Sequence, residues 1–318
     1  MRAIAAYIER GFAQAILVVV VSAVLSLFLP LLSLLSSAVV GLVTLSQGAR
    51  NGIVVIAVSA VITTVLAYLG RGMDANFAIA VAITLLFAVW LPVWLLAWVL
   101  RVTLSLPAAI YVAASIALLG VIAMYIAVDD VAAWWTTVLT ALFEPALQEN
   151  GALVTSTQMD EAIRVLAASM TGLMGAGVVI GFMCSLFIAR WWQAMLYNEG
   201  GFQREFHNLR LHRALVIPVV IALVVSNLAS GVLAGIANDL FVITMAIYML
   251  HGLGLLHGVV AIKKAHKGWL TGVYMAAVFI PPQVMFVLAA AGVSDSWVNF
   301  RANMRAAQLP PPSDPNKE

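Results

Sequence analysis

Apolar stretches long enough to cross a bilayer recur along this chain from about residue 12 to about residue 292. A helix of about 20 apolar residues spans the hydrocarbon core of a membrane, and a somewhat shorter one suffices in a tight hairpin. Hydrophobic residues make up 64% of the chain and charged residues only 9%, whereas about 25% of residues are charged in a typical soluble domain. We therefore predict an all-α protein, a polytopic bundle of transmembrane helices.

The apolar stretches predict eight or nine spans in a single transmembrane domain over residues 1–305. The first two share one apolar run broken only at Pro30, and the last is interrupted by Pro281 and Pro282, so the count depends on these places. Residues 306–318 are Pro-rich and polar, which predicts a disordered tail. The expected spans are 12–29, 31–47, 52–70, 76–100, 106–128, 165–189, 214–237, 240–262 and 269–292.

The charges between the expected spans predict the orientation of the chain. Segment 129–164 carries six acidic residues and one basic residue, whereas segment 190–213 carries four arginines and segment 263–267 three lysines. Basic loops of membrane proteins remain in the cytoplasm. We therefore expect 129–164 to be an outer loop, 190–213 to be a cytoplasmic loop, and the amino terminus to be cytoplasmic. The charges leave the side of the carboxyl terminus open.

The outer loop contains the stretch "AAWWTTVLTALF", which joins Trp134 and Trp135 to an apolar run too short to cross a bilayer. Amphipathic helices of this kind lie in the membrane interface. We expect an interfacial helix that either rests on the lipid headgroups or forms a lid over the outer mouth of the bundle.

No motif for catalysis is recognisable in the chain, which lacks G-x-S-x-G, H-E-x-x-H and the Walker lysine motif. His207 and His212 lie near Glu205, but their spacing does not fit a dependable metal site. We therefore expect a protein that is not an enzyme and that has no catalytic residue, metal, cofactor or nucleic-acid partner.

The stretch "YMLHGLGLLHG" places His251 near the middle of the expected span 240–262, with Tyr248 on the same helical face. Gly254 and Gly258 form a G-x-x-x-G pair, which lets helix backbones approach closely. A polar side chain at this depth is costly unless it faces a partner or a water-filled cavity. His251 is therefore the first candidate for a site.

Neighbouring spans offer polar groups at a similar expected depth. Ser226 and Asn227 fall near the middle of 214–237, and Gln283 follows the two prolines of 269–292. Many transporters build their substrate sites from a broken helix at the midplane. Hydrogen bonds between helices, with no ligand, are the structural alternative. The predicted ligand-binding residues are Asn227, Tyr248, His251, Gln283 and Ser226, with Trp94 as an aromatic residue that could stack on a ligand.

No acidic residue lies at the depth of His251 in any expected span, so a carboxylate-to-histidine proton relay lacks its usual second member. Burial disfavours a charged imidazole, so we expect His251 to be neutral. We expect His251→Gln to retain a ligand and His251→Leu to impair its retention.

The segments "QGARNG", which follows an apolar hairpin, and "AAAGVSDSWVNFR", near the end, resemble the YybS-like family of predicted bacterial membrane proteins over most of residues 10–305. That family is distantly similar to the S components of energy-coupling factor vitamin transporters. The resemblance implies a helical bundle in the bacterial inner membrane that captures a small molecule. S components have fewer helices and dock their partner through small residues on the first helix, where this chain offers only Ser22 and Ser26. The resemblance therefore leaves coupling to an ATPase module in doubt.

Two functional hypotheses follow. The first is an inner-membrane protein, surrounded by lipid, that binds a small molecule in a midplane cavity among the last three spans and is a candidate transporter of it. The second is a non-catalytic scaffold that binds another membrane protein through small-residue faces. An enzyme acting inside the membrane ranks third, because no nucleophile can be paired with a base. The small-residue pairs are Gly177 with Gly181, Gly231 with Gly235, and Gly254 with Gly258.

Overall fold

The computed structural model of the chain describes residues 1–69, 75–149, 156–266 and 268–307. Its regular secondary structure is helical throughout these residues, as the apolar pattern predicted, and none of them forms a strand. The tail expected over 306–318 falls almost wholly outside the described part of the chain, at 308–318.

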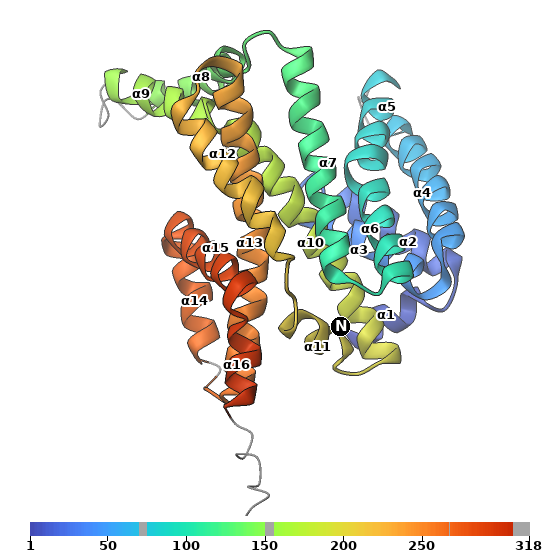
Figure 1. Ribbon diagram of the computed structural model, residues 1–318. Coiled ribbons are helices and arrows are strands. Elements are labelled where there is room, and N and C mark those ends of the chain that lie inside the picture. Colours follow the sequence, from blue (N-terminus) through green and yellow to red (C-terminus); the bar gives the residue numbers. More distant parts are fainter. Residues whose placement is uncertain (70–74, 150–155, 267, 308–318) are drawn as a thin grey trace, which may run out of the picture.

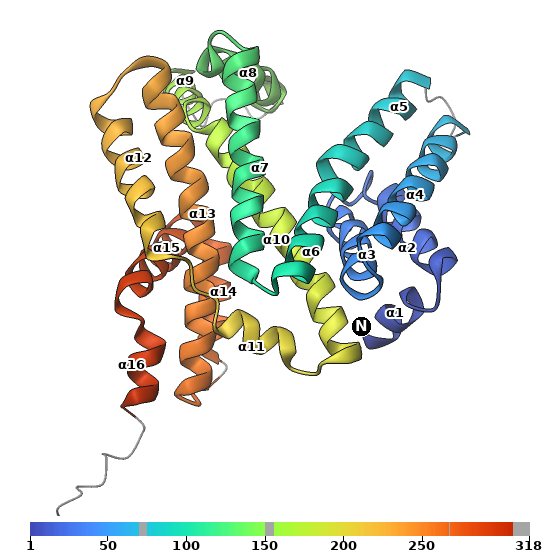
Figure 2. The same ribbon diagram turned by 45° about the vertical axis from the view of Figure 1, so that its right-hand side comes forward.

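The helices pack into a bundle that divides at one end, where α5 stands apart from α7, α12 and α13 (Figures 1 and 2). Helix α10 is central, because it contacts α3, α7 and α13. In chain order the elements are α1 Arg2–Ile8, α2 Phe12–Leu25, α3 Leu32–Gln47, α4 Ala49–Leu69, α5 Ala75–Thr84, a π-helical segment Leu85–Trp90, α6 Leu91–Thr103, α7 Leu106–Ala127, α8 Val131–Glu149, α9 Ser156–Ala167, α10 Met170–Tyr197, α11 Gly201–His207, a 3₁₀ turn Arg213–Leu215, α12 Val216–Leu228, α13 Gly231–Ile262, α14 Gly268–Phe279, α15 Pro281–Val298 and α16 Phe300–Ala306.

The number of helices that can cross a membrane is smaller than the sequence pattern predicts. Five stretches in the described residues are long and apolar enough, or up to six if α1 and α2, bent by 119°, form one broken span. These helices are consistent with a multi-pass membrane protein, but not with eight or nine spans. The five stretches are Ala49–Leu69, Ile79–Thr103, Leu106–Ala127, Met170–Tyr197 and Gly231–Ile262.

The boundary between the expected spans 214–237 and 240–262 lies earlier in the chain than predicted. Helix α12 has only 13 residues, whereas α13 has 32. The chain turns at Ser230 and Gly231, and Gly231 adopts a φ of +66°, which glycine does without strain. The sequence places the break near Asn238 and Asp239, because a charged residue is rare inside a span, but both lie within α13.

The expected span 269–292 is not one helix but two, α14 and α15, joined by a turn at Ile280. Helix α14 rises beside one half of α13, the chain reverses at Ile280, and α15 leads back toward the same end (Figures 1 and 2). Pro281 and Pro282 occupy the first positions of α15. A helix leaves its first N–H groups unpaired, so prolines there begin a helix instead of breaking one. Helix α12 accompanies the other half of α13 (Figure 1).

The glycines of α13 are contact points inside the chain. A Cβ atom on Gly252 would lie 1.8 Å from the Leu288 carbonyl oxygen, and one on Gly292 would lie 2.3 Å from the Tyr248 carbonyl oxygen, so α13 and α15 touch through their backbones. Gly254 and Gly258 similarly pack on the Phe206 and His207 carbonyl oxygens. Gly252, Gly254 and Gly258 thus pack internally, as their pattern predicted.

Helices α8 and α9 lie at one end of the bundle, and α1 and α11 lie at the other (Figures 1 and 2). The described helices of segment 129–164 and helix α11 of segment 190–213 therefore lie at opposite ends. The second segment is mostly helical where the sequence predicts a loop, because α10 continues to Tyr197 and α11 follows.

Candidate functional site

His251 is fully buried and contacts a carboxylate. Its Nε2 atom lies 3.0 Å from Oδ2 of Asp295, which is also fully buried. The same oxygen accepts a hydrogen bond of 2.7 Å from Arg301, a residue only 4% exposed. The other Asp295 oxygen accepts the Phe300 N–H at 2.9 Å. Buried charges require such pairing, and the charges of Asp295 and Arg301 cancel.

The backbone between Asp295 and Arg301 brings the two side chains together. Helix α15 ends at Val298, and Asn299 adopts a left-handed conformation with a φ of 53°. Asparagine tolerates this conformation better than most residues. The chain therefore bends into α16, and Arg301 meets a carboxylate six positions earlier in the sequence.

Arg301 also fixes the chain that follows α11. Its guanidinium donates to the His207 carbonyl at 2.7 Å and to the Leu209 carbonyl at 2.7 Å. A guanidinium carries five N–H donors, so it can satisfy these acceptors and Asp295 together. The segment after α11 climbs alongside α13 toward α12 (Figures 1 and 2).

Asp295 overturns the expectation that His251 has no acidic neighbour. The last predicted span ends at residue 292, but α15 continues to Val298, and the chain reversal at Ile280 lays it against α13. The two residues of the pair are 44 positions apart, so no local pattern announces their contact.

The partners of His251 assign its tautomer. Asp295 is held as a carboxylate by Arg301 and can only accept, so His251 Nε2 carries the proton that it shares with Asp295. The Nδ1 atom is then an acceptor. The Ser296 hydroxyl oxygen lies 3.5 Å from Nδ1 and 3.2 Å from the Gly292 carbonyl oxygen. His251 thus presents a free basic nitrogen toward Ser296.

Ser296 also borders a cavity of about 570 Å³ between α7, α15 and the segment that precedes α12. This volume lies in the range of about 300–1,000 Å³ of small-molecule sites. Arg210 donates to the Ser296 carbonyl at 3.0 Å, and the His212 N–H donates to the Tyr111 hydroxyl at 2.9 Å. We call this space the arginine cavity. Its lining residues are Tyr111, Arg210, Leu211, His212, Arg213 and Ser296.

The arginine cavity is positively charged. Arg210 and Arg213 are exposed, and neither makes an ion pair with a carboxylate in the described part of the chain. The cavity therefore offers two guanidinium groups without a carboxylate partner within that part of the chain, of which that of Arg210 also binds the Ser296 carbonyl oxygen.

Tyr248 adds a buried hydroxyl near this cavity. Its side chain is fully buried, and its hydroxyl makes no well-formed hydrogen bond in the structure, although Ser296 and Tyr111 lie near it. Buried hydroxyls nearly always have a partner. The rings of Tyr248 and His251 are 6.2 Å apart between centroids, on the same face of α13 as predicted.

The other predicted ligand-binding residues lie elsewhere. Asn227 is exposed at the end of α12 and donates to the Leu223 carbonyl of its own helix, with Ser226 beside it. His251 lies twenty residues after the start of α13, which is about 30 Å along the helix. The predicted depth of Asn227 is wrong, because α12 is shorter than the predicted span.

Gln283 and Trp94 are also separate from His251. Gln283 is exposed on α15 and borders an apolar groove between α13, α14 and α15. Trp94 donates to the Ala49 carbonyl at 2.9 Å and stacks on Trp98, in the contact between α4 and α6. Helices α7 and α10 stand between α6 and α13 (Figure 2). The structure therefore brings together only Tyr248 and His251 of the predicted set.

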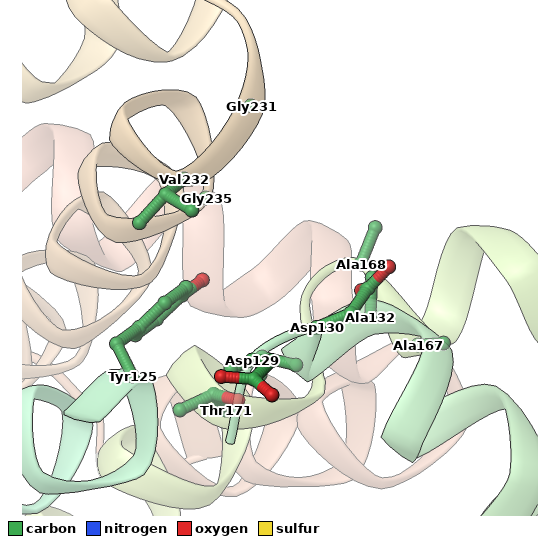
Figure 3. A pocket seen from close by; sticks show the side chains of 11 residues that line it. Tyr125, Asp129, Asp130, Ala132, Ala167, Ala168, Thr171, Gly231, Val232 and Gly235 are labelled. Carbon is green, nitrogen blue, oxygen red and sulfur yellow. The ribbon is translucent and has the colours of Figure 1, made fainter. Parts of the chain in front are cut away.

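A second cavity, of about 400 Å³, lies at the opposite end of the bundle between α7, α8, α10 and α13. Tyr125, Asp129 and Thr171 border it from neighbouring elements (Figure 3). Tyr125 donates to Oδ2 of the buried Asp239 at 3.0 Å, and the Gly172 N–H donates to Oδ1 at 2.8 Å. Asp239, on α13, thus caps the start of α10. These hydrogen bonds explain why the carboxylate is buried, and no ligand is needed to explain it.

No group of three metal-ligating side chains occurs within the described ranges. Comparison with known proteins finds no matching family model, no similar curated protein and no similar solved structure. The resemblance to the YybS-like family therefore stays a prediction.

Proposed function

We propose that this protein is a multi-pass protein of the bacterial inner membrane that binds a small anionic molecule in the arginine cavity. The observation that carries the proposal is the pair Arg210 and Arg213, which line a cavity of ligand size and have no carboxylate partner among the described residues. Arginine matches carboxylate and phosphate groups with two parallel hydrogen bonds. The Tyr111 hydroxyl accepts the His212 N–H and keeps its own proton, which it can donate to such a ligand.

The neighbouring helices favour a transport role. Helix α12 and the α14–α15 pair each accompany only part of α13 (Figure 1), and the non-helical segment 208–212 lies between α11 and α12. Irregular backbone at membrane depth occurs where it lines a cavity, and transporters place their sites at such breaks. With segment 190–213 in the cytoplasm, as its charges predict, Arg210 and Arg213 belong to a cytoplasmic segment.

Binding explains the site better than catalysis does. Ser296, His251 and Asp295 form a sequence of contacts that resembles a hydrolase triad, but Ser296 is only 1% exposed and lies inside a regular helix. Nucleophilic serines sit on sharp turns that expose the hydroxyl. Arg301 also shares the carboxylate oxygen that His251 uses. We therefore assign no nucleophile.

The scaffold hypothesis keeps one open surface. Gly252, Gly254 and Gly258 of α13 pack internally, whereas a Cβ atom added to Gly177 of α10, or to Gly231 at the start of α13, would have no neighbouring atom within 4 Å. An empty small-residue face does not by itself identify a partner, so we retain ligand binding as the primary function.

Thermal unfolding of the detergent-purified protein tests the proposal. Inorganic sulfate, added at constant ionic strength, should raise the unfolding midpoint, because a ligand at 100 times its Kd stabilises the folded state by about 2.7 kcal/mol. Arg210→Gln combined with Arg213→Gln should abolish the rise. Arg50→Gln, which removes an exposed arginine at the start of α4, should keep it. Equal rises in all three proteins would refute the site.

A lipid headgroup and a free anion share the chemistry that this cavity recognises. Nanodiscs with and without phosphatidylglycerol separate the two sources. If a headgroup fills the cavity, the anionic lipid will suppress the effect of sulfate. If the ligand is a free anion, sulfate will act equally in both kinds of disc.

A further inference from the structure

We propose that anion binding in the arginine cavity is coupled to the uptake of one proton by Nδ1 of His251. This inference rests on the proposed function. It starts from the fact that one residue, Ser296, touches both the cavity and the buried network.

The network is neutral in its resting state. Asp295 and Arg301 carry opposite charges, and His251 donates its single ring proton to Asp295. Protonation of Nδ1 would convert His251 to an imidazolium, whose charge Asp295 is placed to stabilise at 3.0 Å.

The groups around His251 divide into those that favour protonation and those that oppose it. Asp295 on α15 favours it, whereas Arg301 on α16 opposes it and approaches Nε2 to 3.4 Å. Tyr248 on α13 and Ser296 on α15 are uncharged neighbours. His207, at the end of α11, lies on the far side of Arg301, which binds its carbonyl.

The remaining charges belong to the cavity on the other side of Ser296. Arg210 and Arg213 oppose a further positive charge while the cavity is empty, and His212 would add to their effect if it were protonated. A bound anion neutralises this repulsion. Linkage is reciprocal, so a proton on His251 must raise the anion affinity by the same factor by which the anion raises the proton affinity.

The path for the proton is short and balanced. Ser296 is only 1% exposed, so the transfer requires a local opening between α15 and the cavity. A hydronium ion then gives a proton to the Ser296 hydroxyl oxygen while that hydroxyl gives its own proton to His251 Nδ1. The O–H bond of Ser296 is broken and remade, one N–H bond forms on His251, and water remains in the cavity. Ser296 must release its contact with the Gly292 carbonyl, 3.2 Å away, to face Nδ1.

Isothermal titration with inorganic sulfate, which does not titrate near neutral pH, tests the coupling in the full-length protein. In two buffers of different ionisation enthalpy, we expect about one proton taken up per sulfate bound. Where that uptake is complete, sulfate should bind about tenfold tighter per unit fall in pH. His251→Gln should bind sulfate without proton uptake. His212→Gln should keep the uptake per bound sulfate, whatever its affinity.

The outcomes separate this inference from the function on which it rests. Sulfate binding without proton uptake in the unmodified protein, or unchanged uptake in His251→Gln, would overturn the coupling and leave anion binding intact. Loss of uptake in His212→Gln would place the proton in the cavity and overturn the assignment to His251. Absence of sulfate binding would remove the proposed function itself. If His251→Gln fails to fold, the buffer dependence of the unmodified protein and of His212→Gln still decides.

Discussion

His251 Nε2 and Asp295 Oδ2 lie 3.0 Å apart in a place where neither side chain reaches solvent. The pair joins the middle of α13 to the end of α15, and Arg301 completes its charge balance. The stability of this part of the bundle therefore depends on these few atoms.

Removal of the carboxylate charge should leave Arg301 buried without its counter-charge. We expect Asp295→Asn to lower the free energy of unfolding by about 3–5 kcal/mol. Arg301→Gln also loses the hydrogen bonds to the His207 and Leu209 carbonyl oxygens, so the coupling of the charges is measured with both single variants. The double variant Asp295→Asn/Arg301→Gln should lose less stability than the sum of the two single losses, by about 1 kcal/mol or more. Denaturant unfolding in detergent measures all three, with the exposed Asp129→Asn as the matched control. Strictly additive losses would show that the charges are not coupled.

The contact between α13 and α15 should not tolerate a methyl group at Gly252. Its Cβ would lie 1.8 Å from a backbone oxygen of Leu288, which cannot move without displacing α15. We expect Gly252→Ala to lose more than about 2 kcal/mol of stability, in the range of overpacked cores. Gly177→Ala is the control, because nothing lies within 4 Å of its Cβ position, and a gain of up to about 1 kcal/mol is expected there from helix propensity. Similar stabilities of the two variants would contradict the close approach.

The Tyr248 hydroxyl is buried without a well-formed hydrogen bond. Deletion of an unpaired buried polar group does not remove a favourable interaction, so Tyr248→Phe should be neutral or stabilising by up to about 1 kcal/mol in the absence of a ligand. Thermal unfolding without added anion measures this. A loss of stability beyond about 1 kcal/mol would show that the hydroxyl bonds to Ser296 in solution.

His207 should make the protein less stable in mild acid. Burial, with Arg301 nearby, lowers the pKa of His207 below its usual 6.5. The unfolded chain then binds the proton first, so the contribution of neutral His207 is present above about pH 6.5 and is lost as the pH falls toward the folded pKa. His207→Gln should therefore be less sensitive than the unmodified protein to a change from pH 7 to pH 5.5. Identical pH profiles of unfolding would contradict this assignment.

The apolar pattern was enough to predict a helical membrane protein, but it could not predict the number of crossings. Pro281 and Pro282 look the same in sequence whether they break one span or begin a second helix after a reversal, because both arrangements lack the same N–H groups. Asp239 indicated a loop by its charge. Its partners, the Gly172 N–H and the Tyr125 hydroxyl, lie 67 and 114 positions away and are invisible to a local pattern.

The candidate site was only partly predictable for the same reason. The depth of His251 and its spacing from Tyr248 follow from the helix period, and the structure places both on one face of α13 as the pattern indicated. Asp295 and Arg301 reach His251 only because α15 and α16 fold back on α13. Arg210 and Arg213 were informative in sequence, but as a signal of orientation, since unpaired basic residues next to a span serve that role in most membrane proteins.

Direct binding of radioactive sulfate by equilibrium dialysis tests the central claim most directly. The purified protein should bind about one sulfate per chain, and the loss of two charge-assisted contacts in Arg210→Gln/Arg213→Gln should weaken binding at least about tenfold. Arg50→Gln should bind sulfate as the unmodified protein does. Saturable binding that is equally strong in the double variant, or no saturable binding in the unmodified protein, would contradict an anion site in the arginine cavity.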